Sequence, residues 1–168
     1  PLNLISGPGL VVSTVNNEIM VLRSQKNMEN MVRNLKLCTM YSFKTKVSRR
    51  NTDLYKEAPV SASFPEMDEN SSAVFSVKPL DGEYVLLDDF GENIPSMKVK
   101  LNDTVISPIG KLIVTPTWKY DDFINTAILV RHVPLRSVAG SYRGRIGVSR
   151  DSERNALLRL YLQDTSPL

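Results

Sequence analysis

Two pairs of adjacent carboxylates are the residues of this chain that could do acid–base or metal chemistry. Asp88 and Asp89 form one pair, and Asp121 and Asp122 form the other. Paired carboxylates can bind a divalent cation or divide the roles of acid and base between them. Both pairs follow apolar runs, at positions where Asp ordinarily forms a turn. We therefore expect turns at both places and no catalytic residue.

Thiol and imidazole chemistry is limited to Cys38 and His132, because the chain has one Cys and one His. A thiolate or imidazole metal cage needs several such ligands. Cysteine–histidine catalysis would require these two distant residues to meet. We predict a small buried side chain for Cys38 and a strand-end position for His132. The sequence thus indicates a protein without catalytic residues, metal site or cofactor.

Glycine-rich phosphate loops are also missing from the sequence. The segment Gly7-Pro8-Gly9 contains a Pro and lacks a following Lys-Ser/Thr. The segment 141–147 has glycines three residues apart but no Gly-x-Gly opening, which argues against a dinucleotide site.

Charge is distributed in blocks along the chain. Residues 23–56 carry nine basic and two acidic residues, residues 57–95 carry nine acidic residues and one Lys, and residues 96–168 carry eleven basic and six acidic residues. Basic surfaces favour nucleic acid or anionic lipid, and opposite surfaces on one protein favour self-association. The candidate phosphate-binding residues are Lys44, Lys46, Arg49, Arg50, Arg136, Arg143, Arg145 and Arg150. The candidate acidic assembly face comprises Asp81, Glu83, Asp88, Asp89 and Glu92.

Period-two apolar patterns bounded by Gly, Pro and Asn predict a chain built mainly of strands. The most informative stretch is 111–131, in which one apolar run lies on each side of Trp118. We expect the Trp118 side chain to anchor a core. Further strands are expected at 10–15, 18–22, 37–48, 73–77, 83–87, 97–101, 104–106, 146–148 and 156–162. For 123–132 and 156–162 a helical conformation stays open, although we favour strands.

One short helix is predicted at about 24–36. Met28, Met31, Val32 and Leu35 lie at i, i+3, i+4 and i+7, which places them on one helix face. The fold class is therefore mainly β, an antiparallel β-sandwich or jelly-roll-like single domain with one short helix. Its expected organisation is a turn-rich arm at 1–9 and a domain at 10–168, with a long polar loop at about 51–72 and a basic loop at 135–145.

The sequence favours an intracellular site of synthesis. No run approaches the ~20 apolar residues that a membrane-spanning helix needs. A lone Cys provides no internal disulfide, which points to cytoplasmic synthesis. Pro1 fits either removal of an initiator Met or cleavage of a longer precursor.

The turn-rich arm, short strands, polar loops and blocked charge are typical of coat or matrix proteins of RNA viruses. We therefore expect a non-enzymatic structural protein that forms homo-oligomers and contacts RNA or an anionic surface, with the virion as one location. A monomeric nucleic-acid-binding accessory or transport module is the first alternative. A peptide-binding β-domain, in which a sheet edge accepts a partner strand, is the second.

Overall fold

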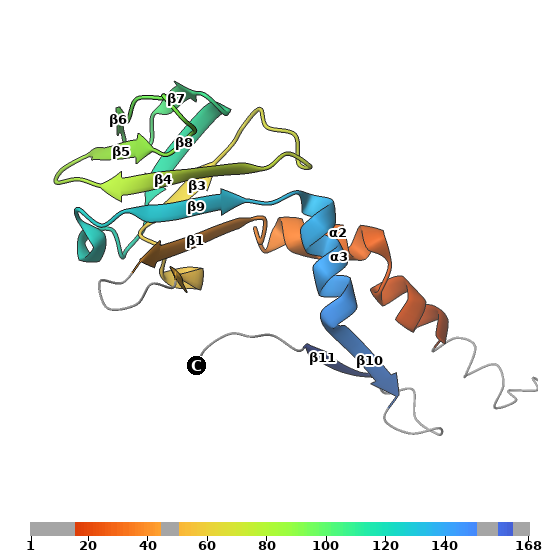
Figure 1. Cartoon of the computed structure of the whole chain (residues 1–168). Helices are drawn as coiled ribbons and strands as arrows, with labels where there is room; N and C mark the ends of the chain where they lie inside the picture. Colours follow the sequence, from red (N-terminus) through yellow and green to blue (C-terminus); the bar gives the residue numbers. More distant parts are fainter. Residues whose placement is uncertain (1–15, 45–50, 151–157, 163–168) are drawn as a thin grey trace, which may run out of the picture. The chain divides into compact units, whose positions relative to one another are not determined.

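A computed structural model describes residues 16–44, 51–150 and 158–162 of the chain. The chain divides into two compact units, one made of residues 37–134 and the other of residues 1–36 with 135–168 (Figure 1). We call them the sandwich unit and the helix–hairpin unit. All strand pairs described are antiparallel, so the expected mainly β, antiparallel fold is confirmed.

The sandwich unit contains two sheets. The larger sheet has the strand order β2 (Asn51–Asp53), β1 (Thr39–Lys44), β9 (Ile128–His132), β4 (Ala73–Pro79), β5 (Tyr84–Asp88) and β6 (Met97–Lys100). The smaller sheet has the order β3 (Val60–Ser63), β8 (Gly110–Pro116) and β7 (Thr104–Ser107). Segment 128–132 is thus a strand, and Asp121–Phe123 before it forms the short 3₁₀ helix η2.

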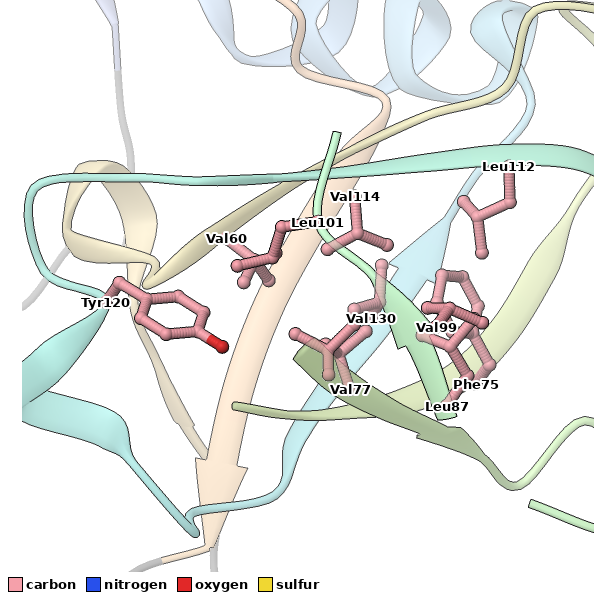
Figure 2. Close-up of a cluster of buried hydrophobic side chains, with 11 residues drawn as sticks. Val60, Phe75, Val77, Leu87, Val99, Leu101, Leu112, Val114, Tyr120 and Val130 are labelled. Atoms are coloured by element: carbon pink, nitrogen blue, oxygen red, sulfur yellow. The ribbon is translucent and has the colours of Figure 1, made fainter. Parts of the chain in front are cut away.

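The core lies where the inner faces of the two sheets meet. Because strand side chains alternate, β4 and β5 contribute every second residue to it. The buried cluster comprises Val60, Phe75, Val77, Val85, Leu87, Val99, Leu101, Leu112, Val114, Tyr120 and Val130 (Figure 2). Full burial of a Val, Leu or Phe side chain contributes about 1.5–3 kcal/mol. This cluster therefore holds the two sheets together as a sandwich.

Tyr41 adds a polar link between the two sheets. Its hydroxyl accepts a hydrogen bond from the backbone N–H of Ala62 in β3, with an N–O distance of 2.8 Å. Burial raises the pKa of Tyr41, while the bond from Ala62 acts against this rise.

Segment 51–72 is more regular than a long polar loop. It contains β2, the 3₁₀ helix η1 (Tyr55–Glu57) and β3, whereas we expected a loop over the whole segment. Leu54 and Ala58 are buried and pack with Ile128 in a second small cluster. The four-residue spacing of Leu54 and Ala58 was the feature of the sequence that indicated regular structure in this segment.

The helix–hairpin unit contains the predicted helix, α2 (Gln25–Asn34). The hydroxyl oxygen of Ser24 caps its start by accepting a hydrogen bond from the N–H of Asn27 at 3.4 Å. Met28 and Val32 are buried, but Leu35, at the end of the predicted apolar stripe, is 62% exposed. The stripe therefore faces the interior over its first turns only.

Two predictions in this unit are wrong. Residues 16–22 are helical, with the Arg23 N–H bonded to the Ile19 carbonyl, where we expected a turn and a strand. The expected basic loop at 135–145 is the helix α3 (Leu135–Arg145), which packs against α2. Leu135, Val138 and Ala139 are buried along α3, so its apolar face outweighs the two glycines in it.

After α3 the chain forms a two-stranded hairpin of β10 (Ile146–Arg150) and β11 (Leu158–Leu162). Gly147 lies opposite Tyr161, and a Cβ atom at Gly147 would collide with the Tyr161 ring. The ring thus lies directly over the glycine backbone. Segment 158–162 is a strand, as we favoured.

No helix within the described part of the chain is long and apolar enough to cross a membrane. The turn-rich arm at 1–9 and the strand expected at 10–15 lie outside the described residues.

Candidate functional site

The outer face of the six-stranded sheet is the most distinctive surface of the sandwich unit. Val77 in β4 is paired with Ile128 and Leu87, and all three side chains are buried. The next residue, Lys78, pairs with Leu86 in β5, and Leu86 pairs with Lys98 in β6. Because neighbouring side chains in a strand point to opposite faces, Lys78 and Lys98 lie outside the sandwich.

Five basic residues share this outer face. They are Lys44, Lys78, Lys98, Lys100 and Arg131. Phe43 in β1 and Val77 in β4 both pair with Ile128 in β9. Lys44 follows Phe43 and Lys78 follows Val77, so Lys44 lies in line with Lys78 and Lys98. We call Lys44, Lys78 and Lys98 the lysine row. Successive members are two strands apart, which places their Cα atoms about 10 Å from one another.

Large apolar side chains are exposed on the same face. Met40 and Val74 pair with Arg131 from either side, and each is 47% exposed. Tyr84 is 42% exposed, and the Lys98 ammonium lies 4.7 Å from the centre of its ring. Asp53 and Asp88, which pair with Ser42 and Ser76, lie on this face as well. The face therefore combines a net positive charge with exposed apolar area, a combination that is typical of interaction surfaces.

The five predicted acidic residues lie at the two ends of β5. Asp81 and Glu83 precede it, and Asp88, Asp89 and Glu92 come at its end and after it. Five strand residues span about 17 Å, so the five carboxylates do not form one continuous patch. Glu83 forms an ion pair with Lys100 at 3.2 Å, and this hydrogen bond raises the pKa of Lys100.

We call Asp88, Asp89 and Glu92 the acidic loop. Its backbone is tightly turned, since Asp89, Gly91 and Asn93 have φ angles of 59°, 147° and 64°. The Asp88 carboxylate accepts a hydrogen bond from the Asp89 N–H at 2.9 Å. Within this loop the Phe90 ring stacks on buried Phe75 with 5.2 Å between ring centres. The loop is thereby anchored to the core.

The predicted phosphate-binding residues belong to different parts of the chain. Lys44 ends β1 and is exposed, and Lys46, Arg49 and Arg50 lie outside the described residues. Arg136, Arg143 and Arg145 belong to α3, and Arg150 ends β10. Arg136 and Arg143 are exposed, whereas the Arg145 guanidinium lies 4.4 Å from the centre of the Tyr142 ring. Arg136, Arg143 and Arg145 are therefore displayed by a helix and not by a loop.

The two carboxylate pairs lie in different structures, since Asp88 ends β5 and Asp89 follows it. Asp121 and Asp122 lie in η2, where Asp122 forms an ion pair with Lys119 at 3.0 Å. Among the described residues, no three His, Cys, Asp or Glu side chains are grouped closely enough to hold a metal ion. Of these four carboxylates, Asp122 thus acts as an ion-pair residue.

His132 is packed at the end of β9. Its Nδ1 atom lies 2.9 Å from the Thr39 hydroxyl, and its ring lies 4.9 Å from that of Phe64. Burial lowers the pKa of His132 from its ordinary value of 6.5. His132 thus links β9 to β1, as expected for a strand-end residue.

The expectation for Trp118 is wrong. Its side chain is 75% exposed, with the Lys119 ammonium 4.6 Å from the ring centre. Tyr120, two residues later, is buried and anchors the segment instead. Both aromatic residues follow the same strand, and the sequence pattern does not distinguish which of them points inward.

Sequence reasoning missed most of the basic outer face. Lys78 lies within the acidic block of the sequence, and Lys98, Lys100 and Arg131 were not among the candidates. The alternation of Lys98 and Lys100 with Val99 was a usable signal, because it places two ammonium groups on one face of β6. Comparison of the chain with protein-family models and with curated protein sequences finds no match.

Proposed function

We propose that this chain is a non-enzymatic structural protein, a coat- or matrix-like building block that self-associates and contacts nucleic acid or an anionic surface through basic side chains. The observation that supports this proposal best is the outer face of the six-stranded sheet. There, five basic residues surround exposed Met40, Val74 and Tyr84. A surface of this kind loses apolar exposure when a partner covers it.

The helix–hairpin unit also presents an apolar surface. Leu160, Tyr161 and Leu162 in β11 are 59%, 58% and 51% exposed. Ile146 and Val148 pair with Leu162 and Leu160, so one face of the hairpin is apolar. A two-stranded hairpin is marginally stable in water unless its apolar face is covered. A partner that covers this face would stabilise it.

Size-exclusion chromatography with light-scattering detection, at low and high salt, tests this proposal. We expect oligomers at low salt whose mass decreases as salt screens the basic face. The protein should first be treated with nuclease, and RNA should then be added back in a second run. A protein that stays monomeric at every salt concentration, with and without RNA, would refute the proposal.

A monomeric nucleic-acid-binding module is the second candidate. The lysine row beside Tyr84 favours it, because ammonium groups bind phosphates and an exposed aromatic ring can stack on a base. Here the wild type would bind RNA as a monomer, and the affinity would fall steeply with salt. Fluorescence anisotropy with labelled single-stranded RNA, combined with scattering on the same samples, separates the two functions.

A further inference from the structure

We infer that self-association is head-to-tail, with the acidic loop of one copy docked on the lysine row of a second copy. This inference rests on the proposed function and names the interface through which it acts. In this arrangement each copy uses its acidic loop in one contact and its lysine row in another, so the contact is heterologous and leads to a closed ring or an open filament.

The lysine row is the part of the basic face that is available for an outside partner. Among the described residues, Lys44, Lys78 and Lys98 have no carboxylate within 4.0 Å, whereas Lys100 is paired with Glu83. Lys44 and Lys98 are exposed, and Lys78 is half-buried between them. Three ammonium groups in line form a positive stripe across the sheet that attracts an acidic segment.

The acidic loop complements this row in charge and in rigidity. Asp89 and Glu92 are exposed, and neither forms an ion pair within the described residues. Between them, the Phe90 ring is fixed on Phe75. Because the loop is already ordered, docking loses little conformational entropy.

Charge alone would give a weak contact, since exposed ion pairs contribute little. The apolar side chains of Met40, Val74 and Tyr84 share the outer face with the lysine row and add area that a second copy can cover. We therefore expect association that is steered by charge and held by apolar contact.

Two variants of the full chain, each with two charged side chains replaced by neutral ones, test the interface. Lys78→Gln/Lys98→Gln removes charge from the lysine row, and Asp89→Asn/Glu92→Gln removes it from the acidic loop with near-isosteric side chains. Asn also tolerates the positive φ angle of Asp89. Each variant alone should elute as a monomer under conditions in which the wild type assembles. An equimolar mixture should form a 1:1 dimer and nothing larger, because only one functional interface can form.

Lys111→Gln/Glu66→Gln is the control for two neutralised side chains outside the interface. It removes the charges of Lys111, in β8 of the three-stranded sheet, and of its ion-pair partner Glu66. This variant should assemble like the wild type. Circular dichroism and thermal unfolding establish that each variant is folded. A zero-length carbodiimide cross-link provides a second measurement, since in the wild type it should join Lys78 or Lys98 of one copy to Asp89 or Glu92 of another.

The outcomes separate this inference from the proposed function. A wild type that never assembles refutes both. A wild type that assembles while the two neutral variants do so equally well refutes the head-to-tail interface and leaves self-association standing. Assembly that is lost on nuclease treatment and restored by RNA also refutes the interface, because RNA would then occupy the lysine row. Monomeric variants, a mixture that stops at the dimer and the expected cross-link support it.

Discussion

The Tyr120 hydroxyl lies 2.7 Å from the backbone carbonyl oxygen of Tyr84, to which it donates a hydrogen bond. It also accepts a hydrogen bond from the N–H of Leu80 at 3.3 Å. Tyr120 therefore ties the segment after β8 to the turn that joins β4 to β5. This turn also carries Asp81 and Glu83, so one buried side chain holds a charged edge of the sandwich in place.

Replacement of Tyr120 by Phe should lower the free energy of unfolding by about 1 kcal/mol, the usual net contribution of one hydrogen bond. The Tyr84 carbonyl keeps its bond from the Leu80 N–H, which limits the loss. Urea denaturation followed by circular dichroism measures the difference. An unchanged midpoint would show that the hydroxyl contributes nothing to stability.

Trp118 provides the comparison for Tyr120. Its ring is largely in solvent, so Trp118→Ala should change the free energy of unfolding by no more than about 0.5 kcal/mol. The same urea titration measures it, and quenching of wild-type tryptophan fluorescence by iodide should report a fully accessible ring. A loss of several kcal/mol would mean that Trp118 anchors the core after all.

The stability of the protein should depend on His132 below neutral pH. Burial lowers the pKa of this imidazole in the folded state, whereas in the unfolded chain it titrates at 6.5. The unfolded state therefore binds the proton first. The contribution of neutral His132 is complete above pH 6.5 and is lost progressively as the pH falls from there toward the lower folded pKa.

His132→Asn isolates this effect, because the chain has a single histidine. The difference in unfolding free energy between wild type and variant should be constant above about pH 7.5 and should shrink toward about pH 5. Denaturant midpoints across this range provide the measurement. A difference that does not vary with pH would contradict the lowered pKa.

The link between the two sheets can be tested at Tyr41. Tyr41→Phe removes the acceptor of the Ala62 N–H and should destabilise the protein by about 1–2 kcal/mol. Hydrogen exchange at the Ala62 amide should become faster than can be explained by the change in global stability. The neighbouring amides of β8 serve as the reference, and equal acceleration at both places would argue against a local effect.

The cap of α2 is a further test site. Ser24→Ala removes the acceptor of the Asn27 N–H and should cost about 1 kcal/mol, whereas Ser24→Gly should cost only a few tenths. Thermal unfolding of the two variants gives the comparison. Equal losses would indicate that the Ser24 side chain does not cap the helix.

The strands of the sandwich unit could be predicted because their signals are local. Alternation around Val99, and breakers such as Gly110 and Pro116, define strands without reference to the rest of the chain. Helix α2 could also be predicted, because Ser24 marks its start and the spacing of Met28 and Val32 marks its buried face.

Helix α3 was missed because two glycines and three arginines obscured its apolar period. Leu135, Val138 and Ala139 have helical spacing, and Pro134 precedes them, as is common where a helix starts. The helical spacing of apolar residues was therefore present in the sequence, but it was weak.

The basic outer face could not be predicted from the charge blocks, because it depends on which strands pair. Lys44, Lys78 and Lys98 belong to three different charge blocks and come together only through the sheet order β1, β9, β4, β5 and β6. Long-range strand pairing is not encoded in any short pattern. The acidic residues likewise form a block in the sequence but lie at opposite ends of β5.

The edges of the six-stranded sheet restrict how copies of this protein can meet. One border, β2, is only three residues long, and the other, β6, carries Lys98 and Lys100 on a four-residue strand. A very short border strand and a border strand that carries ammonium groups each oppose pairing with an incoming strand. Polymerisation by strand addition is therefore disfavoured at this sheet, so contacts between copies would have to use its faces.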